Sequence, residues 1–364
     1  MRVIVTGGGT GGHIYPAIAI ADKIKEKSPS SEILYIGNEI GLEKDIVPKA
    51  GYDIKLVSAK WFDRSNILKI FDTGFTVMKG IRQSLKIMKE FKPDVVIGTG
   101  GFVCVPVMFA AKKYGAKTYI HEQNAFPGVA NKTLEKYVEK VFLGFPDGGK
   151  YFKEPEKHVN AGNPVRQSFF DITKDEARKK LGISDQAFVV FSFGGSQGAE
   201  KINEVAFDLM ETVNGQKDII LVFGTGSQYY DDIQKKINEK NIDVKDNIRI
   251  LSYINDMDNY LCACDLVISR AGALSVAETT VCGKASILIP SPNVTGNHQY
   301  YNAKAVADKG GAILIEEKDL TSEILIKEVL KLKNNRNILE KMSIASRQCA
   351  PDSATDIIYK NIMK

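Results

Sequence analysis

The sequence predicts an α/β protein of two doubly wound domains, each a parallel sheet with helices on both faces. Its apolar runs are short and unbroken rather than alternating, and helix-compatible stretches separate them, as in strands buried on both faces of a sheet. An apolar run followed by a glycine-rich turn occurs near the start and again in the second half. A chain of 364 residues, 44% hydrophobic and 26% charged, is an ordinary globular composition and exceeds one typical domain.

Four apolar runs of the first half are expected to be strands: 2–5, 33–37, 95–97 and 118–120. The first run leads into the glycine turn 6–12 and then into a helix expected over 17–27. The last two runs end directly at 98–101 (GTGG) and 121–124 (HEQN). Ligands of such folds bind at the carboxyl ends of the strands, so these three turns are candidate site elements.

The second half repeats this organisation after a turn-like break at 162–164 (GNP). Its expected strands are 188–191, 219–224, 248–251, 266–269 and 285–290. We therefore expect a first domain over 1–163, a second over 164–345 and a cleft between them. The final segment, 346–364, is one that could cross back to the first domain.

The first glycine turn has two interpretations. Gly7, Gly9 and Gly12 match the dinucleotide-binding fingerprint, with Glu39 at the end of the second strand as a candidate ribose-binding acid. The next residue, His13, argues against this, because an imidazole at the helix start would intrude on a pyrophosphate. We expect His13 to face the cleft as a general base or an acceptor-binding group, the alternative being a histidine that only caps the turn.

The second glycine turn, 194–199 (GGSQGA), is better suited to phosphate. Successive backbone N–H groups at a helix start bind anions, and Ser196 adds a hydroxyl donor. The turn lacks the lysine of a P-loop, which disfavours a γ-phosphate nucleotide. Further along, Glu278 lies in an otherwise apolar helix and needs partners there. Two hydroxyls of a ribose would satisfy it, and so would a buried ion pair.

Several other features exclude function classes. In the Asp-x-Asp segment 256–258, Asn255 and Asp256 are interpreted as the N-cap of a helix over 257–264 whose dipole the acids complement, so no metal is expected. The five cysteines form no disulfide or zinc pattern and are interpreted as buried thiols. A net charge of +5 is too small to indicate nucleic-acid binding. The N-terminus shows no signal-peptide pattern, so we expect a protein that stays in the cytoplasm.

The positive charge is concentrated in one segment, 60–92. It holds eight basic residues against three acidic ones, together with the only tryptophan, Trp61, and several large apolar residues. Such a composition suits docking at the headgroups of anionic lipids without spanning the bilayer. The alternative is a helix that packs its apolar face on the sheet.

Taken together, seven motifs resemble those of one family, the MurG N-acetylglucosaminyltransferases of bacterial cell-wall synthesis. The motifs are 7–16 (GGGTGGHIYP), 98–102 (GTGGF), 121–124 (HEQN), 162–166 (GNPVR), 194–199 (GGSQGA), 269–278 (SRAGALSVAE) and 297–303 (NHQYYNA). The resemblance covers nearly the whole chain and implies the two-domain GT-B fold. It implies transfer of GlcNAc from UDP-GlcNAc to the muramyl C4 hydroxyl of undecaprenyl-diphospho-muramoyl-pentapeptide (lipid I), giving lipid II with inversion, without metal or cofactor.

The resemblance also implies roles for individual residues. Thr10, Gly11, Gly12 and Asn124 would line the cleft against the donor sugar and the acceptor. His13 is the best-placed titratable group to act as the catalytic base, with His121 as the second choice. The donor-side residues are Arg166, Ser196, Ile254, Ala273, Leu274, Ser275, Val276, Ala277, Glu278 and Gln299. Ser196 and its turn would hold the UDP diphosphate, Glu278 the ribose hydroxyls and the Ile254 backbone the uracil. The chain departs from the family at Phe102, where some members have tyrosine, so no hydroxyl chemistry is assigned there.

A lipid-linked acceptor favours membrane contact through 60–92 and implies a peripheral protein at the cytoplasmic face of the cell membrane. The expected partners are thus UDP-GlcNAc, lipid I and anionic inner-leaflet lipids, with no nucleic acid and no protein partner indicated. Three alternatives remain open: a UDP-GlcNAc 2-epimerase, an NAD oxidoreductase, and a lipid-glycan-binding protein without catalysis. Lipid-linked product formed in the presence of EDTA would separate the transferase from all three.

Overall fold

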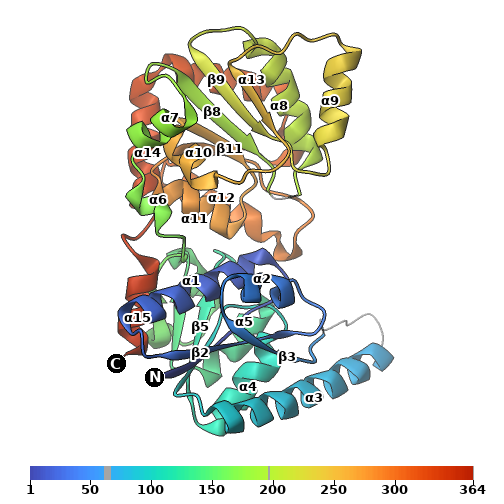
Figure 1. Ribbon diagram of the computed structural model, residues 1–364, viewed down its shortest axis with the longest axis vertical. Coiled ribbons are helices and arrows are strands. Elements are labelled where there is room, and N and C mark those ends of the chain that lie inside the picture. Colours follow the sequence, from blue (N-terminus) through green and yellow to red (C-terminus); the bar gives the residue numbers. More distant parts are fainter. Residues whose placement is uncertain (61–66, 196, 364) are drawn as a thin grey trace. The chain divides into compact units, whose positions relative to one another are not determined.

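The computed structural model describes residues 1–60, 67–195 and 197–363, and it confirms the predicted fold class. The chain forms two all-parallel sheets, one of seven strands and one of six, with helices on both faces (Figure 1). Its contacts divide it into two compact domains. The N-terminal domain comprises Met1–Val165 with Ser353–Lys364, and the C-terminal domain comprises Arg166–Asp352.

The N-terminal sheet has the order β3-β2-β1-β4-β5-β6-β7. Its strands are β1 (Arg2–Thr6), β2 (Glu32–Asn38), β3 (Asp53–Val57), β4 (Val95–Gly98), β5 (Lys117–Glu122), β6 (Lys140–Leu143) and β7 (His158–Asn160). Its helices are α1 (Gly11–Lys27), α2 (Glu43–Lys49), α3 (Ile67–Phe91), α4 (Cys104–Tyr114), α5 (Val129–Leu134) and α15 (Ala354–Ile362). Strand order reverses between β1 and β4, so the loops that follow these two strands diverge and leave room for a site.

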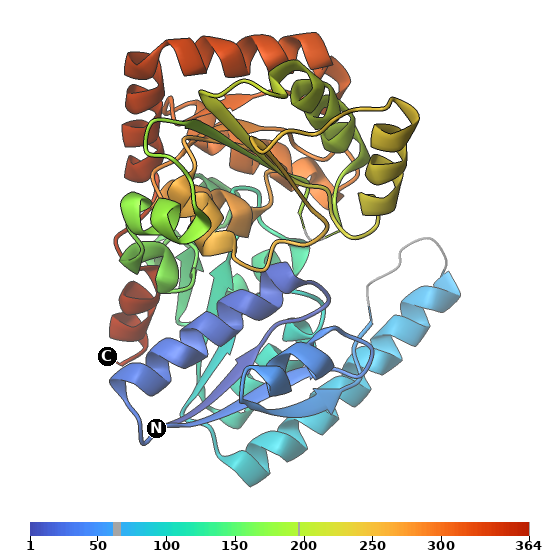
Figure 2. The same cartoon turned by 45° about the horizontal axis from the view of Figure 1, so that its top comes forward.

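Two helix layers cover this sheet. On one face, α1 packs beside α15, the last helix of the chain, and Ile14 and Ile358 are buried in one apolar cluster (Figure 1). The hydroxyls of Ser28 and Tyr359 are hydrogen bonded at 2.8 Å. On the other face, α3 packs along α4 and buries Met88 (Figure 2).

The C-terminal sheet has the order β10-β9-β8-β11-β12-β13, the same winding as the first six strands of the other sheet. Its strands are β8 (Phe188–Phe193), β9 (Ile219–Gly224), β10 (Ile248–Leu251), β11 (Leu266–Ser269), β12 (Ala285–Leu288) and β13 (Ala312–Leu314). Its helices are α6 (Ser168–Asp171), α7 (Lys174–Leu181), α8 (Glu200–Val213), α9 (Tyr230–Glu239), α10 (Met257–Ala263), α11 (Ala273–Val281), α12 (His298–Ala307), α13 (Ser322–Asn334) and α14 (Arg336–Gln348). The loops that follow β8 and β11 flank the corresponding reversal.

Every strand predicted from the apolar runs is present, with bounds within two residues of those expected. One helix boundary was wrong: the helix after the first glycine turn begins at Gly11 rather than at residue 17, with Pro16 inside it. Proline removes one donor and is tolerated near a helix start, where few intrahelical bonds are lost. As a consequence, His13 lies in the first turn of α1 instead of in a loop before it.

Candidate active site

In the N-terminal domain, the turns after β1 and β4 are packed backbone against backbone. The Gly8 N–H donates to the carbonyl of Gly100 at 3.3 Å. A Cβ at Gly101, whose φ is +83°, would lie 2.3 Å from the Gly8 oxygen, and one at Gly7 would lie 2.1 Å from the Thr99 hydroxyl. These glycines are therefore required by the contact between the two turns.

A carboxylate of the same domain occupies the first glycine turn. Glu43, at the start of α2, is completely buried and accepts hydrogen bonds from Asn38 N at 2.8 Å and Gly9 N at 3.3 Å. A Cβ at Gly8 would lie 2.3 Å from its Oε1. The turn thus already holds an anion, which would repel the pyrophosphate of a dinucleotide. This internal carboxylate argues against the NAD interpretation.

His13 is held against the turn after β4. Its Nδ1 lies 3.0 Å from the carbonyl oxygen of Thr99 and 3.1 Å from Oε1 of Gln123. Gly100 makes this position possible, because a Cβ there would lie 2.8 Å from the same Nδ1. Among the described residues, Nε2 of His13 has no hydrogen-bond partner, which leaves it available to accept a proton from a ligand.

The residues after β5 connect His13 to the interior of the domain. Gln123 donates through Nε2 to Nδ1 of His121 at 2.9 Å, and His121 contacts the carbonyl of Gly162 through its Nε2 at 2.9 Å. Burial lowers the pKa of His121 to about 4, so this histidine is neutral at physiological pH. Because both its nitrogens have partners inside the protein, His121 has no ring nitrogen left to accept a proton from a ligand.

Asn124 is fixed by its neighbour Glu122. The Glu122 carboxylate accepts from the backbone and side-chain nitrogens of Asn124 at 2.9 and 3.1 Å, and also from Gly128 N and the Asn131 amide. This network defines the loop after β5, and Asn124 is linked to His13 through the adjacent Gln123. Thr10 and Gly12 are exposed at the start of α1 and Gly11 is partly so, which places all three on the surface beside His13.

In the C-terminal domain, the second glycine turn is also closed by a backbone contact. Gly195 and Gly198 have φ values of +96° and +84°, and Gly198 N donates to the carbonyl of Gly195 at 3.0 Å. A Cβ at Gly198 would lie 2.2 Å from the carbonyl oxygen of Thr225. No carboxylate accepts from the described N–H groups of this turn. Ser196, the predicted diphosphate ligand, lies outside the described residues.

Glu278 is placed on α11 with no hydrogen-bond partner for its carboxylate among the described residues. The adjacent hydroxyls do not serve it, since Thr279 donates to the Ser275 carbonyl and Thr280 to the Ala277 carbonyl. Burial raises the pKa of Glu278 to about 7, partly offset by the positive charge of Arg166 and reinforced by the negative charge of Asp258. A partly buried carboxylate without hydrogen-bond donors is a strong candidate for ligand binding.

Three charged side chains therefore share this region: Glu278, Arg166 and Asp258. The Arg166 guanidinium lies 5.0 Å from the centroid of the Phe169 ring and is exposed. Partial burial raises the pKa of Asp258. Hydrogen bonds from Ser168 and from the Asn259 backbone, together with the charge of Arg166, lower it by more, so the pKa of Asp258 lies below its usual range. Asp258 thus has partners within the domain.

Asp256 is engaged as well. It immediately precedes α10, pairs with Lys180 at 3.0 Å and accepts from the Asn259 amide at 2.8 Å. The two aspartates of the Asp-x-Asp segment are therefore both committed to protein contacts. Within the described residues, no cluster of three or more metal-ligating side chains is found.

The remaining donor-side candidates follow neighbouring strands. The Ile254 side chain packs on the end of β9, where a Cβ at Gly224 would lie 2.6 Å from its Cδ1. Within the described residues its N–H and C=O have no hydrogen-bond partner, so both can meet the edge of a base. Gln299 accepts from Ser291 N at 2.9 Å, which ties the start of α12 to the segment after β12.

The first turn of α11 contains the other candidates. Ala273, Val276 and Ala277 are buried, whereas Leu274 and Ser275 are partly exposed. Gly272 precedes the helix without any side-chain cap, so the first N–H groups of α11 have no partner inside the helix. These donors and the Glu278 carboxylate lie on the same short helix, so α11 combines unpaired N–H groups at its start with a carboxylate that has no hydrogen-bond partner among the described residues.

Sequence reasoning missed four polar residues that build these sites: Glu43, Glu122, Gln123 and Arg270. Arg270 donates to the carbonyls of Ile289 and Pro290 and pairs with Glu317, so it clamps the turn after β11. Glu122 and Gln123 belong to a noted motif, and that signal could have identified them. Glu43 had no signal, because its partners are the backbone N–H groups of Asn38 and Gly9, which no side-chain pattern in the sequence marks.

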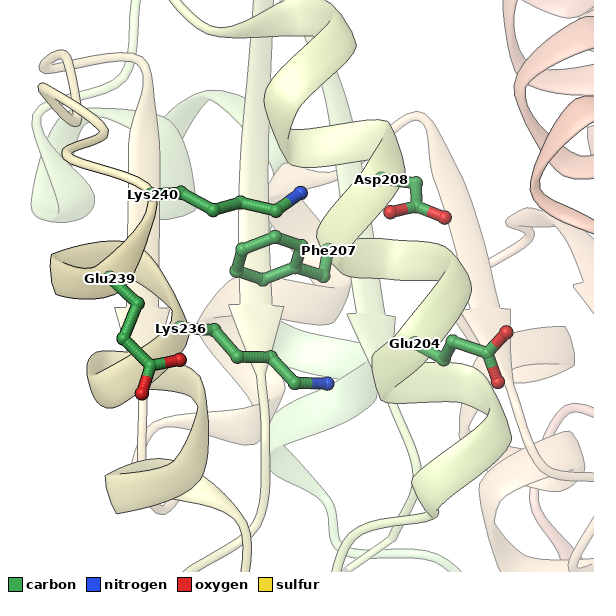
Figure 3. Close-up of a pocket in the computed structure, with 6 residues that line it drawn as sticks. All are labelled: Glu204, Phe207, Asp208, Lys236, Glu239 and Lys240. Atoms are coloured by element: carbon green, nitrogen blue, oxygen red, sulfur yellow. The ribbon is translucent and has the colours of Figure 1, made fainter.

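A surface pocket of about 210 Å³ lies elsewhere on the C-terminal domain, between α8 and α9 (Figure 3). Its lining residues are Glu204, Phe207, Asp208, Lys236, Glu239 and Lys240. Lys240 stands over the Phe207 ring at 5.1 Å and pairs with Glu211, and Asp208 accepts from Ser322. Because the pocket runs along the helices and not at the strand ends, it is separate from the candidate site.

Comparison with known proteins identifies the class of this fold and site. The model of the glycosyltransferase family 28 N-terminal domain matches residues 3–143, and that of the family 28 C-terminal domain matches residues 189–357. The protein is therefore a family 28 glycosyltransferase with the GT-B fold.

Individual relatives identify the family within this class of glycosyltransferases. The UDP-N-acetylglucosamine–N-acetylmuramyl-(pentapeptide) pyrophosphoryl-undecaprenol N-acetylglucosamine transferase of Alkaliphilus oremlandii is 45% identical over 362 residues, covering 100% of this chain and 98% of that protein. The crystal structure of Acinetobacter baumannii MurG matches with a TM-score of 0.80 and 26% identity, over 100% of this chain and 99% of that one. The chain belongs to the MurG family of N-acetylglucosamine transferases.

The 2-epimerase alternative is represented among the structural neighbours too. A putative UDP-N-acetylglucosamine 2-epimerase from Listeria monocytogenes matches with a TM-score of 0.73, over 99% of this chain and 95% of that one. Its sequence identity is only 14%, so the likeness extends to the fold alone. Full-length identity at the level of the Alkaliphilus protein is what distinguishes the transferase family from the epimerases.

Proposed function

We propose that this protein transfers N-acetylglucosamine from UDP-N-acetylglucosamine to the C4 hydroxyl of the muramyl sugar of lipid I, giving lipid II with inversion at the anomeric carbon. One observation in the structure supports this best. Each domain contains a titratable candidate group that has no hydrogen-bond partner among the described residues: Nε2 of His13 in the N-terminal domain and the Glu278 carboxylate in the C-terminal domain. A base and a sugar-hydroxyl acceptor are what this reaction requires.

The N-terminal domain would act on the acceptor. Nε2 of His13 takes the proton from the C4 hydroxyl as its oxygen attacks the anomeric carbon, a role that typically contributes 10²–10⁴-fold. Thr10, Gly11 and Gly12 lie beside it at the start of α1, where their backbone groups can contact the sugars. Asn124, held by Glu122, supplies a rigid polar side chain on the same domain.

The C-terminal domain would bind the donor. Glu278 accepts hydrogen bonds from the two ribose hydroxyls, and the backbone of Ile254 pairs with the uracil edge. The first N–H groups of α11, over 273–277, and the glycine turn that contains Ser196 bind the diphosphate. Arg166 and Gln299 complete the donor contacts.

Catalysis without a metal follows from these groups. The UDP leaving group gains negative charge in the transition state, and fixed N–H donors at a helix start stabilise that charge without any reorganisation. Arg166 adds a positive charge in the same region. These donors do the work that a divalent cation does in other nucleotide-sugar enzymes.

The assay is transfer of radiolabelled GlcNAc from UDP-GlcNAc to a lipid I analogue, with and without EDTA. Lipid-linked disaccharide in both arms supports the proposal. Epimerised UDP-sugar in the absence of acceptor would favour the epimerase, and the absence of any product with folded protein would favour a non-catalytic binding protein.

Membrane docking through α3 is the second part of the proposal. Phe75 and Met78 are 71% and 52% exposed, and Lys79 and Arg82 are exposed on the same helix face at helical spacing. The opposite face packs on the domain: a Cβ at Gly80 would lie 2.3 Å from the Ser58 carbonyl oxygen. Within the basic segment 60–92, residues 61–66, including Trp61, lie outside the described residues.

No helix in the described part of the chain is long and apolar enough to cross a bilayer. An apolar stripe flanked by cations suits insertion at the headgroup level, where each basic residue adds about 1 kcal/mol on anionic lipid. We therefore infer a peripheral protein at the cytoplasmic face of the membrane, bound to anionic lipids of the inner leaflet.

Co-sedimentation with anionic vesicles at low and high salt tests the docking. The double variant Lys79→Glu/Arg82→Glu should lose most binding and keep its affinity for UDP. A matched control, Lys217→Glu/Lys309→Glu, makes the same charge change at exposed positions of the C-terminal domain and should sediment like the wild type. An equal loss of vesicle binding in both variants would show that the effect comes from the change in net charge alone. Wild-type protein that never sediments with the vesicles would refute docking.

A further inference from the structure

We propose that Gln123 is a positioning residue for His13: it holds the ring with the proton on Nδ1 and the lone pair on Nε2. The proposal deepens the proposed function and rests on its assignment of His13 as the general base. It follows from a chain of hydrogen bonds that begins inside the domain at Gly162 and ends at His13.

The first step fixes the proton of His121. Its Nε2 lies 2.9 Å from the Gly162 carbonyl oxygen, which can only accept, so Nε2 carries a proton. His121 is fully buried, and burial lowers its pKa to about 4, so the ring holds one proton in total. Its Nδ1 must therefore accept a hydrogen bond.

The second step fixes the amide of Gln123. Its Nε2 lies 2.9 Å from that accepting Nδ1 and 2.8 Å from the Thr99 carbonyl oxygen. A flipped amide would direct Oε1 at both of these acceptors at once. The NH₂ group therefore faces His121 and Thr99, and Oε1 faces His13.

The third step reaches His13. Its Nδ1 is 3.1 Å from Gln123 Oε1 and 3.0 Å from the Thr99 oxygen, two atoms that only accept, so Nδ1 carries the proton. In the neutral ring the lone pair is then on Nε2, the nitrogen that has no partner among the described residues. When Nε2 takes the acceptor proton, both oxygens still accept from Nδ1 and stabilise the imidazolium. Gln123 thus favours the basic tautomer and its conjugate acid.

The test combines kinetics with histidine spectroscopy. Gln123→Met removes the amide at similar volume and should lower kcat roughly ten- to a hundredfold, the cost typical of removing a group that orients a functional histidine, with KM for both substrates changed less than about threefold. Gln123→Leu also removes the acceptor that faces His13 and should lower kcat to a similar extent, so it serves as the test variant where Gln123→Met does not fold.

A matched control is available on the same strand. Thr118→Val deletes a buried hydroxyl that donates to the Tyr137 carbonyl at 3.0 Å. Thr118 lies near the start of β5, whereas Gln123 follows the end of that strand. This variant should lose stability but keep the wild-type kcat. A fall in kcat as large as that of Gln123→Met would assign the effect to general loosening of the domain and overturn the proposal.

Two further measurements separate positioning from structure. In nitrogen NMR spectra of histidine-labelled protein, with the His13 signal assigned from His13→Ala, Gln123→Met should raise the share of the Nε2–H tautomer, and Thr118→Val should not. In a His13→Ala background, Gln123→Met should lower kcat little further. Either an unchanged tautomer or an undiminished kinetic cost in that background would overturn the proposal.

The outcome for His13→Ala alone distinguishes this proposal from the function on which it rests. If His13→Ala keeps its turnover, the assignment of the base fails. The tautomer measurement still reports, independently of activity, whether Gln123 determines the proton position on His13.

Discussion

The two glycine turns occupy the same place in two sheets of the same strand order, yet they are filled differently. In the N-terminal domain, the turn after β1 gives its Gly9 N–H to the buried carboxylate of Glu43. In the C-terminal domain, the turn after β8 is closed by the Thr225 backbone, and no carboxylate accepts from its described N–H groups. One turn has an internal anion and the other has donors to offer.

A glycine pattern therefore does not by itself predict an anion site. Glycine permits close approach of the backbone, but the approaching group can be a phosphate, a neighbouring turn or a side chain of the same domain. The carboxylates of the two domains differ in the same way in their hydrogen-bond donors. Glu43 accepts from two backbone N–H groups and shapes its turn, whereas Glu278 has no hydrogen-bond donor among the described residues.

The largest expected effect comes from the N-terminal side. His13→Ala should lower kcat by about 10²–10⁴-fold, since a positioned base contributes that much, and should leave the UDP affinity unchanged because the donor contacts are on the other domain. Steady-state transfer to a lipid I analogue and calorimetric titration of UDP measure the two quantities. Near-normal turnover would remove His13 from the mechanism, and a parallel loss of UDP affinity would break the division of roles between the domains.

Next in size is the donor side. Glu278→Ala should weaken UDP binding about ten- to a hundredfold, because a charged acceptor of sugar hydroxyls contributes roughly 1.5–3 kcal/mol. Thr280→Val, on the same helix, deletes a hydroxyl that is bonded to the Ala277 carbonyl and should bind UDP normally. Unchanged affinity in folded Glu278→Ala protein would make Glu278 structural, like Glu43.

The burial of Glu278 also predicts a pH dependence of stability. Burial raises its pKa from 4.5 to about 7, so the folded state keeps a proton that the unfolded state releases between these values. The free energy of unfolding should therefore fall as pH rises from about 4.5 to 7, by roughly 1–3 kcal/mol from this group. Glu278→Gln should be more stable than the wild type at pH 8 and similar at pH 4.5 in thermal unfolding, and an equal difference at both values would contradict this.

Much of the fold could be predicted because most buried strands are unbroken apolar runs. The strands missed are β3, β6, β7 and β13, and three of them are edge strands, which are less buried and so less apolar in pattern. The sequence of β3, for example, alternates charged and apolar residues, and only its last residue is buried. An edge strand forms because it pairs with a neighbouring strand, and the local sequence does not show that pairing.

The position of a candidate side chain could be predicted where a distinctive local motif contains it, as at His13 and Glu278, but its hydrogen-bond partners could not be predicted where they are distant in sequence. The orientation of His13 depends on Thr99 and Gln123, which only the pairing of β4 with β5 brings beside β1. The occupant of the first glycine turn comes from α2, and nothing in the spacing of Glu43 from Gly9 indicates a contact. The resemblance to a family supplied roles, and the packing supplies the reasons for them.

The last and smallest change concerns the first glycine turn, which the Glu43 carboxylate occupies. Glu43→Gln preserves shape but replaces one acceptor oxygen by a donor that faces a backbone N–H, so it should lower the free energy of unfolding by about 1–2 kcal/mol. UDP affinity should not change, because this turn has no place for the donor. Glu39→Gln is the matched control: Glu39 is an exposed acid at the end of β2 with one hydrogen bond, from Ser58, and its loss should cost less than about 0.5 kcal/mol. Denaturant unfolding measures both variants, and equal stability of the two would mean that the buried carboxylate does not hold the turn. A weakened affinity for UDP in Glu43→Gln alone would show that the two turns are not divided as their contacts indicate.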